Sequence, residues 1–154
     1  MSIENKMFAK PGDKHQLETG LMFSPKFDAA GLIPVITQDA TSGEILMFAF
    51  MNELALEKTL TTKTVHYWSR SRNKLWLKGE TSGETQAVVE IKTDCDQDVI
   101  LIRANVSGRG AACHTGRKTC FYRSIDLEAA AKGKATALNL TGGTPLFDPK
   151  EVYK

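Results

Sequence analysis

The three cysteines of this chain lie within one short stretch, and their residue type and spacing suggest metal chemistry. Seventeen residues separate Cys95 from Cys113, and six residues separate Cys113 from Cys120. Thiolates are soft ligands that favour zinc, and three protein ligands with an open fourth position are typical of a catalytic zinc site. The Cys-x-x-Cys pair of a zinc finger is absent, so three reduced, partly buried cysteines are the alternative. Polar neighbours on both sides of two of the thiols favour zinc.

Three aspartates alternate around the first cysteine, in the run Asp94-Cys95-Asp96-Gln97-Asp98. If this segment is extended, the alternation directs the three carboxylates to one side and Cys95 to the other. Carboxylates are hard ligands that suit magnesium or calcium. An EF-hand calcium loop is excluded, because the run has Val at the sixth position and Asn at the twelfth instead of Gly and Glu. A magnesium-like site remains, with a solvated acidic turn as the alternative.

His114 directly follows Cys113 and allows three interpretations. It could be a fourth zinc ligand, a general base, or a structural histidine. Adjacent residues rarely bind one ion with good geometry, so we favour a catalytic role in proton transfer.

Candidate groups for binding phosphate or ribose are Arg70, Arg72, Lys78, Thr81 and Ser82. Arg70 and Arg72 alternate, so they would point the same way and could make bidentate contacts with phosphate oxygens. Trp68 and Trp76 could stack on a purine, although aromatic residues in strands more often pack in a core. The combination indicates a phosphorylated, aromatic substrate.

Hydrophobic patterns predict the elements that position these residues. Strand-like runs occupy 32–37, 45–50, 64–69, 74–78, 86–92 and 99–104, and two helices occupy 52–60 and 126–132. Consecutive strands should pair as hairpins, with residues 94–98 at the tip of the third. The predicted class is α+β, a mostly antiparallel and barrel-like sheet with a few short helices.

Length and charge predict one globular domain and limit the kinds of partner it binds. The 154 residues divide into an N-terminal extension (1–19) that we expect to be loosely attached, a domain (20–133) and a C-terminal tail (134–154). The net charge of +2 without charged blocks indicates neither nucleic-acid nor membrane partners. The absence of a signal-like stretch and the odd number of cysteines predict a soluble protein of the reducing cytoplasm.

Four ordered motifs resemble the phosphoribosyl-AMP cyclohydrolase family of histidine biosynthesis. They are Trp68-Ser69-Arg70-Ser71-Arg72, Leu75-Trp76-Leu77-Lys78-Gly79-Glu80-Thr81-Ser82-Gly83, Asp94-Cys95-Asp96-Gln97-Asp98 and Ala112-Cys113-His114-Thr115-Gly116, continuing to Cys120-Phe121-Tyr122. The similarity runs from about residue 27 to residue 123. No later segment is long enough for a second, fused enzyme domain, so the monofunctional form is expected.

The resemblance implies a substrate, two metals and an assembly. The family opens the adenine ring of phosphoribosyl-AMP at the N1–C6 bond with zinc-activated water, and it also needs magnesium. By similarity, Cys95, Cys113 and Cys120 are the zinc ligands, and Asp94, Asp96 and Asp98 are the magnesium ligands. The family is an obligate homodimer with intertwined active sites, in which Cys95 and the other two cysteines come from different subunits.

Two other functions fit the residues less well. A zinc-dependent purine deaminase would carry His-x-Glu and Pro-Cys-x-x-Cys signatures, which this chain lacks. A structural zinc module that binds nucleic acid would need a fourth ligand and a basic surface.

Overall fold

The computed structural model describes residues 7–154, which form an α+β fold with mostly antiparallel strands and short helices, as predicted. The elements along the chain are α1 (Lys14–Thr19), β1 (Ile33–Asp39), β2 (Ile45–Met51), α2 (Glu53–Thr62), β3 (His66–Ser69), β4 (Lys74–Leu77), β5 (Gln86–Thr93), β6 (Ile100–Val106), β7 (Arg123–Ile125), α3 (Leu127–Ala131), β8 (Leu138–Leu140) and α4 (Pro149–Val152). None of the described helices is long and apolar enough to cross a membrane.

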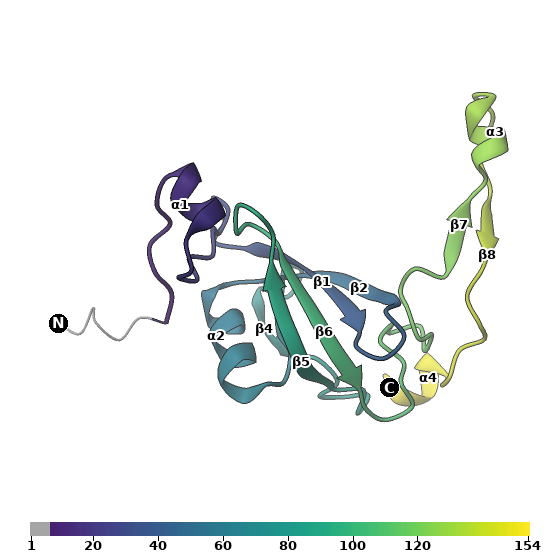
Figure 1. Cartoon of the computed structure of the whole chain (residues 1–154). Coiled ribbons are helices and arrows are strands. Elements are labelled where there is room, and N and C mark those ends of the chain that lie inside the picture. Colours follow the sequence, from purple (N-terminus) through teal and green to yellow (C-terminus); the bar gives the residue numbers. More distant parts are fainter. Residues whose placement is uncertain (1–6) are drawn as a thin grey trace.

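Four strands form the central sheet in the order β2-β1-β6-β5 (Figure 1). The pairs β1–β2 and β5–β6 are antiparallel, which confirms two of the predicted hairpins. The hairpins join through β1 and β6, which run parallel and place Val35 beside Ile100. Ile33, Val35 and Thr37 are fully buried and alternate with less buried residues, as expected for a strand with one face on the core.

Helix α2 contributes to the same core and begins where the sequence predicts. The side-chain oxygen of Asn52 accepts a hydrogen bond from the backbone N–H of Ala55 at 2.9 Å, which caps the first turn. Lys63 ends the helix in a left-handed conformation, with φ of 57°. Leu56 is fully buried among the strand residues, and burial of such a side chain contributes about 1.5–3 kcal/mol.

The predicted barrel-like closure is wrong, whereas the predicted hairpin of β3 and β4 is confirmed. That hairpin forms a separate two-stranded sheet. An isolated antiparallel β-bridge between Thr64 and Ala87 connects the chain just before this hairpin to β5 of the central sheet. Within residues 7–154 the strands form no closed barrel. Four-residue strands offer too few ladder positions to bridge the two edges of the central sheet.

The N-terminal segment is attached more firmly than the sequence indicates. Of the predicted extension 1–19, residues 1–6 lie outside the described residues. Leu17 in α1 is buried, and the rings of Phe8 and Phe23 pack edge to face with centroids 5.4 Å apart. The expectation of loose attachment is therefore wrong for the described part, because its apolar side chains have neighbours.

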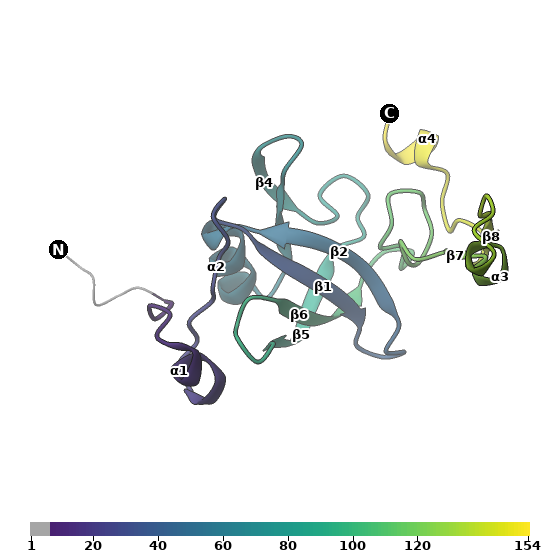
Figure 2. The same cartoon turned by 90° about the horizontal axis from the view of Figure 1, so that it is seen from above.

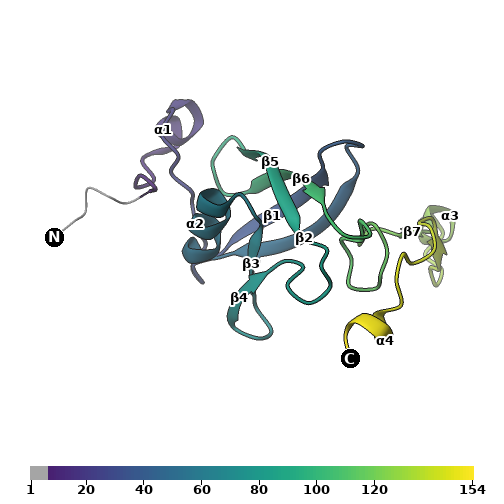
Figure 3. The same cartoon turned by 90° about the horizontal axis from the view of Figure 1, so that it is seen from below.

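The C-terminal residues form an arm and a return segment. The arm (residues 123–140, with β7, α3 and β8) projects away from the central sheet, at the opposite end of the molecule from α1 (Figure 2). Its apolar side chains Ile125, Leu127, Leu138 and Leu140 are exposed. The chain then returns with α4 beside the loop that follows β6 (Figure 3), where the backbone N–H of Leu146 donates to the carbonyl of Gly116 at 2.6 Å.

Candidate functional site

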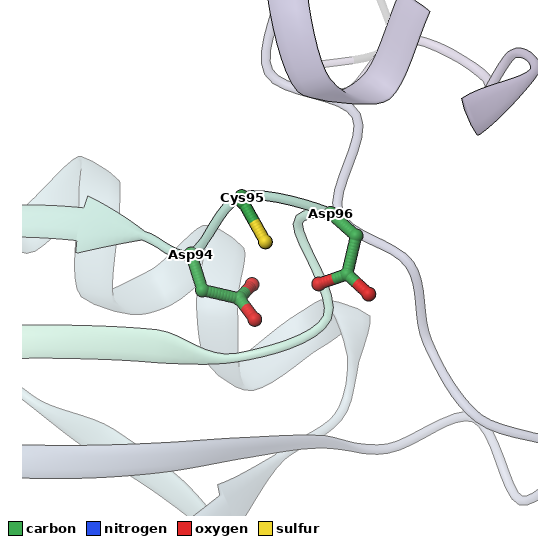
Figure 4. A group of neighbouring side chains, drawn as sticks. All are labelled: Asp94, Cys95 and Asp96. Carbon is green, nitrogen blue, oxygen red and sulfur yellow. The ribbon is translucent and has the colours of Figure 1, made fainter. Parts of the chain in front are cut away.

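The acidic run forms a tight turn between β5 and β6. One Asp94 carboxylate oxygen accepts hydrogen bonds from the backbone N–H groups of Asp98 at 3.0 Å and Val99 at 3.1 Å. One ligand atom from each of Asp94, Cys95 and Asp96 lies within 4.8 Å of the others (Figure 4). The prediction that Cys95 points away from the carboxylates is therefore wrong, because the segment turns instead of extending.

The three carboxylates of the turn share hydrogen bonds. Hydrogen bonding with Asp96, and then with Asp94, raises the pKa of Asp98 to about 6. For Asp94, burial raises the pKa, but hydrogen bonds from Asp98, Asp96 and the backbone outweigh it and hold the pKa below its ordinary value. Like charges this close hold a proton unless a cation replaces it. The carboxylate oxygens of the turn are hard ligands, and a divalent cation could replace the proton that they share. The turn therefore suits a hard divalent cation.

Cation binding at this turn is expected to weaken as pH falls through about 6, the raised pKa of Asp98. Below that pH the carboxyl of Asp98 carries a proton that competes with the cation, and above it the carboxyl is ionised. Affinity for Mn²⁺, measured by calorimetry, should fall about tenfold per pH unit below the pKa. Asp98→Asn should bind more weakly and show a flatter pH profile. If the Mn²⁺ affinity of the unsubstituted protein stays constant across this pH range, the expectation is contradicted.

Cys113 and Cys120 lie together at the ends of their loop. The hydroxyl of Thr115 donates to the Cys113 sulfur at 3.1 Å, and the backbone N–H of Cys120 donates to the carbonyl of Leu46 in β2 at 2.7 Å. A hydrogen bond from Cys120 lowers the pKa of Cys113 to about 5, and the same contact, with burial, raises the pKa of Cys120. A thiol pair of which one member ionises readily suits a soft metal ion.

Cys95 does not join this pair within one chain. Among the described residues, the one cluster of three or more potential metal ligands contains Cys95 but neither Cys113 nor Cys120. The acidic turn precedes β6 and the cysteine loop follows it, so the two lie at opposite ends of a strand of seven residues. Such a strand spans about 23 Å. The three predicted zinc ligands are thus divided between two places in the chain.

A cavity of about 390 Å³ lies beside the cysteine pair and collects most of the predicted substrate-binding residues. Its lining includes Arg72, Lys78, Thr81, Ser82 and His114, together with Trp76 and Tyr153. Arg70 is not part of the lining, because its guanidinium lies over the ring of Phe50, 4.1 Å from the centroid. Trp76 packs against the core and also lines the cavity, and its stacking on a purine stays a prediction.

Lys78 connects the cavity to the thiols. It is buried, and its ammonium lies 5.0 Å from the centre of the Trp76 ring. Burial lowers the pKa of Lys78, while attraction to Cys120, Cys113 and Glu84 opposes that shift. A positive charge held between two thiols and an open cavity can bind an anion on the cavity side.

Comparison with known proteins connects this arrangement to one family. Residues 47–122 match the sequence model of phosphoribosyl-AMP cyclohydrolase. A phosphoribosyl-AMP cyclohydrolase of Mesorhizobium japonicum is 54% identical over 144 residues, which cover 94% of this chain and 92% of that protein. Another, of Rhizobium rhizogenes, is 52% identical over 151 residues, covering 97% of this chain and 99% of that protein. The chain belongs to the phosphoribosyl-AMP cyclohydrolase family.

The family assignment confirms the resemblance that the ordered motifs predicted. The part that matches the phosphoribosyl-AMP cyclohydrolase model contains the acidic turn, the cysteine pair and most of the cavity lining. Tyr153 lies outside that part and still lines the cavity, because the C-terminal segment packs on the cysteine loop. Nothing in its local sequence pattern marks Tyr153 as a site residue.

Glu84 is a second residue that the sequence analysis missed. Its side chain is 1% exposed and accepts from Nε of Arg109 at 2.8 Å and from the backbone N–H of Gly110 at 2.8 Å. These contacts join the 79–83 loop of the cavity to the segment that leads into Cys113. Close approach leaves no room for a side chain at Gly108, where an added Cβ would lie 2.6 Å from a Glu84 oxygen. The sequence signal that could have identified Glu84 is its position directly after Gly83, at the end of the 79–83 loop.

Proposed function

We propose that this chain hydrolyses phosphoribosyl-AMP in histidine biosynthesis and opens its adenine ring at the N1–C6 bond. The observation that carries the proposal is the cavity in which cationic, hydroxyl and aromatic groups meet beside a thiol pair. Its lining offers groups for phosphate, ribose and purine. Membership of the phosphoribosyl-AMP cyclohydrolase family supports the same substrate.

In this proposal zinc is held by Cys95, Cys113 and Cys120, and magnesium by Asp94, Asp96 and Asp98. The low pKa of Cys113 and the hydrogen-bonded carboxylates of the turn support a soft and a hard site respectively. The chemistry that bound zinc supplies is Lewis-acid activation of water. Free thiols at all three cysteines are compatible with the reducing cytoplasm, the compartment we propose.

A second copy of the chain would complete the zinc site. Cys95 lies at one end of β6 and the cysteine pair follows the other end, so a homodimer in which one copy supplies Cys95 to the partner's pair brings the three thiols together. The C-terminal arm supports association, because its four exposed apolar side chains have no core of their own. We therefore propose an obligate homodimer with intertwined active sites.

The side chains of the cavity would bind the substrate and move one proton. Arg72 and Lys78 would bind phosphate oxygens, and Thr81 and Ser82 would donate hydrogen bonds to phosphate or ribose. Arg70, although outside the cavity of one chain, stays a candidate phosphate ligand from an adjoining surface. As the water oxygen bonds to C6 and the N1–C6 bond breaks, exposed His114 would take up the proton that the water loses and deliver it to N1.

The direct test is ring opening by the purified full-length protein. Phosphoribosyl-AMP is incubated with the protein, and ultraviolet absorbance follows the change from purine to opened product. AMP, which lacks the N1 substituent, is the matched control and should not react. A chelator should stop the reaction, and adding zinc and magnesium should restore it. Absence of turnover with both metals present would refute the proposed function.

A further inference from the structure

One side chain connects the acidic turn to the N-terminal segment, which we define as residues 13–24. Gln97 is 5% exposed, although the rest of the turn is exposed or half-buried. Its Nε2 donates to the carbonyl oxygen of Leu17 at 3.0 Å, and its Oε1 accepts from the backbone N–H of Ser24 at 2.7 Å. Leu17 and Ser24 are themselves buried. A single amide therefore holds two points of the N-terminal segment against the turn.

Both halves of the amide are needed for this contact. The carbonyl of Leu17 requires a donor, and the N–H of Ser24 requires an acceptor, so a carboxylate at position 97 could satisfy only the second. An apolar side chain of similar size would leave both buried backbone groups without their partner. The neutral Gln97 among three aspartates is thus explained by its partners and not by the charge of the turn.

The backbone of Gln97 also sets the shape of the turn. Its φ of 60° lies in the left-handed region, which non-glycine residues seldom adopt. The N–H of Gln97 donates to the carbonyl of Asp94 at 3.2 Å, and its own carbonyl accepts from the N–H of Lys26 at 2.7 Å. Contacts on both sides of the turn therefore hold this strained residue, and with it the flanking aspartates, in place.

The N-terminal segment and the turn enclose a second cavity, of about 460 Å³. Leu17 and Phe23 line it from the N-terminal side, and Asp94, Cys95 and Gln97 line it from the turn. The segment is thus a wall beside the ligand atoms that converge at the turn. Movement of this wall would change both the shape of the turn and its access to solvent.

We propose that Gln97 is a positioning residue, which clamps the N-terminal segment onto the acidic turn and couples the order of that segment to divalent-cation binding. The inference rests on the proposed cation site at the turn. The clamp pre-organises the carboxylates, so the cation meets them already in place. Coupling is reciprocal, so the cation in turn stabilises the clamped N-terminal segment.

The test measures cation binding and segment order without substrate. Mn²⁺, a paramagnetic ion of suitable size and charge, is titrated into the full-length protein and followed by electron paramagnetic resonance. Gln97→Met, which keeps the size of the side chain and removes both hydrogen bonds, should bind Mn²⁺ about tenfold more weakly. Amide hydrogen exchange of residues 14–24 should slow when Mn²⁺ is added to the unsubstituted protein, and should not respond in Gln97→Met.

A second variant loosens the clamp without touching the turn. Leu17→Ala removes a buried side chain from the N-terminal segment and should weaken Mn²⁺ binding in the same direction. Lys14→Ala, in the same helix, is the matched control, because Lys14 is exposed and makes one long ion pair with Glu18 at 3.8 Å. It should leave affinity and exchange unchanged. Circular dichroism establishes that each variant is folded, and Leu17→Ala provides the result if Gln97→Met does not fold.

The outcomes separate this inference from the proposed function. If folded Gln97→Met or Leu17→Ala binds Mn²⁺ as tightly as the unsubstituted protein, and Mn²⁺ leaves exchange of residues 14–24 unchanged, the coupling is overturned even where ring opening is normal. If the unsubstituted protein binds Mn²⁺, the variants bind more weakly and phosphoribosyl-AMP is not opened, the coupling stands and the proposed function fails.

Discussion

Replacing Cys113 with serine is expected to remove zinc from the protein and to lower the rate of ring opening about a thousandfold or more. Cys113 is the thiol of the pair that ionises more easily, since a hydrogen bond from Cys120 lowers its pKa to about 5. A serine hydroxyl stays protonated at neutral pH and is a poor ligand for a soft metal. Zinc content measured by atomic absorption and turnover of phosphoribosyl-AMP should fall together.

Thr115→Val is the matched control for this substitution. It removes the hydroxyl that donates to the Cys113 sulfur at 3.1 Å and keeps all three thiols. Zinc should be retained, with a smaller loss of activity. A Cys113→Ser protein that keeps full zinc content would argue against the assigned ligand.

Mixing two inactive variants tests whether the zinc site is shared. A heterodimer of Cys95→Ser and Cys113→Ser contains one site with three thiols and one with a single thiol. If the two variants are mixed in equal amounts and their subunits exchange at random, half of the dimers are heterodimers with one intact site each. About one quarter of the unsubstituted activity should therefore be recovered. Failure to recover any activity, with subunit exchange shown by mass spectrometry, would contradict a site built from two chains.

Replacing Glu84 with alanine is expected to cost about 3 kcal/mol of unfolding free energy, the lower end for a broken buried ion pair. The Glu84 side chain is 1% exposed, whereas Arg109 is 43% exposed and can regain water when its partner is lost. The backbone N–H of Gly110 would also lose its acceptor at 2.8 Å. For a chain of this length, the melting midpoint should fall by about 6–12 °C.

Two further variants define the cause of that loss. Glu84→Gln keeps the shape and one acceptor, so a smaller cost of about 1–2 kcal/mol is expected. Glu80→Ala is the matched control, because this neighbouring glutamate is exposed and should change stability by less than about 0.5 kcal/mol. Urea denaturation followed by circular dichroism measures all three. An unchanged midpoint in Glu84→Ala would show that the contact with Arg109 and Gly110 contributes no stability.

The sequence by itself determined the six strands β1 to β6, the helices α2 and α3, and the family, whereas it did not predict α1, β7, β8 or α4. The helix after Asn52 and the hairpins follow from local signals, namely a capping side chain, periodic apolar residues and turn residues, and each was predicted within two residues of its observed ends. The ordered motifs likewise identified the family, because they are properties of the chain and not of its packing.

Tertiary structure decided how those residues are grouped. Gln97 binds Ser24 and Leu17 across 73 and 80 positions of sequence, and Glu84 binds Arg109 across 25. No local pattern encodes such pairs, since they depend on which segments pack together. The same holds for the cysteines. Their residue type indicates zinc, and the tertiary structure places Cys95 in the acidic turn before β6, apart from the pair Cys113 and Cys120 in the loop after it.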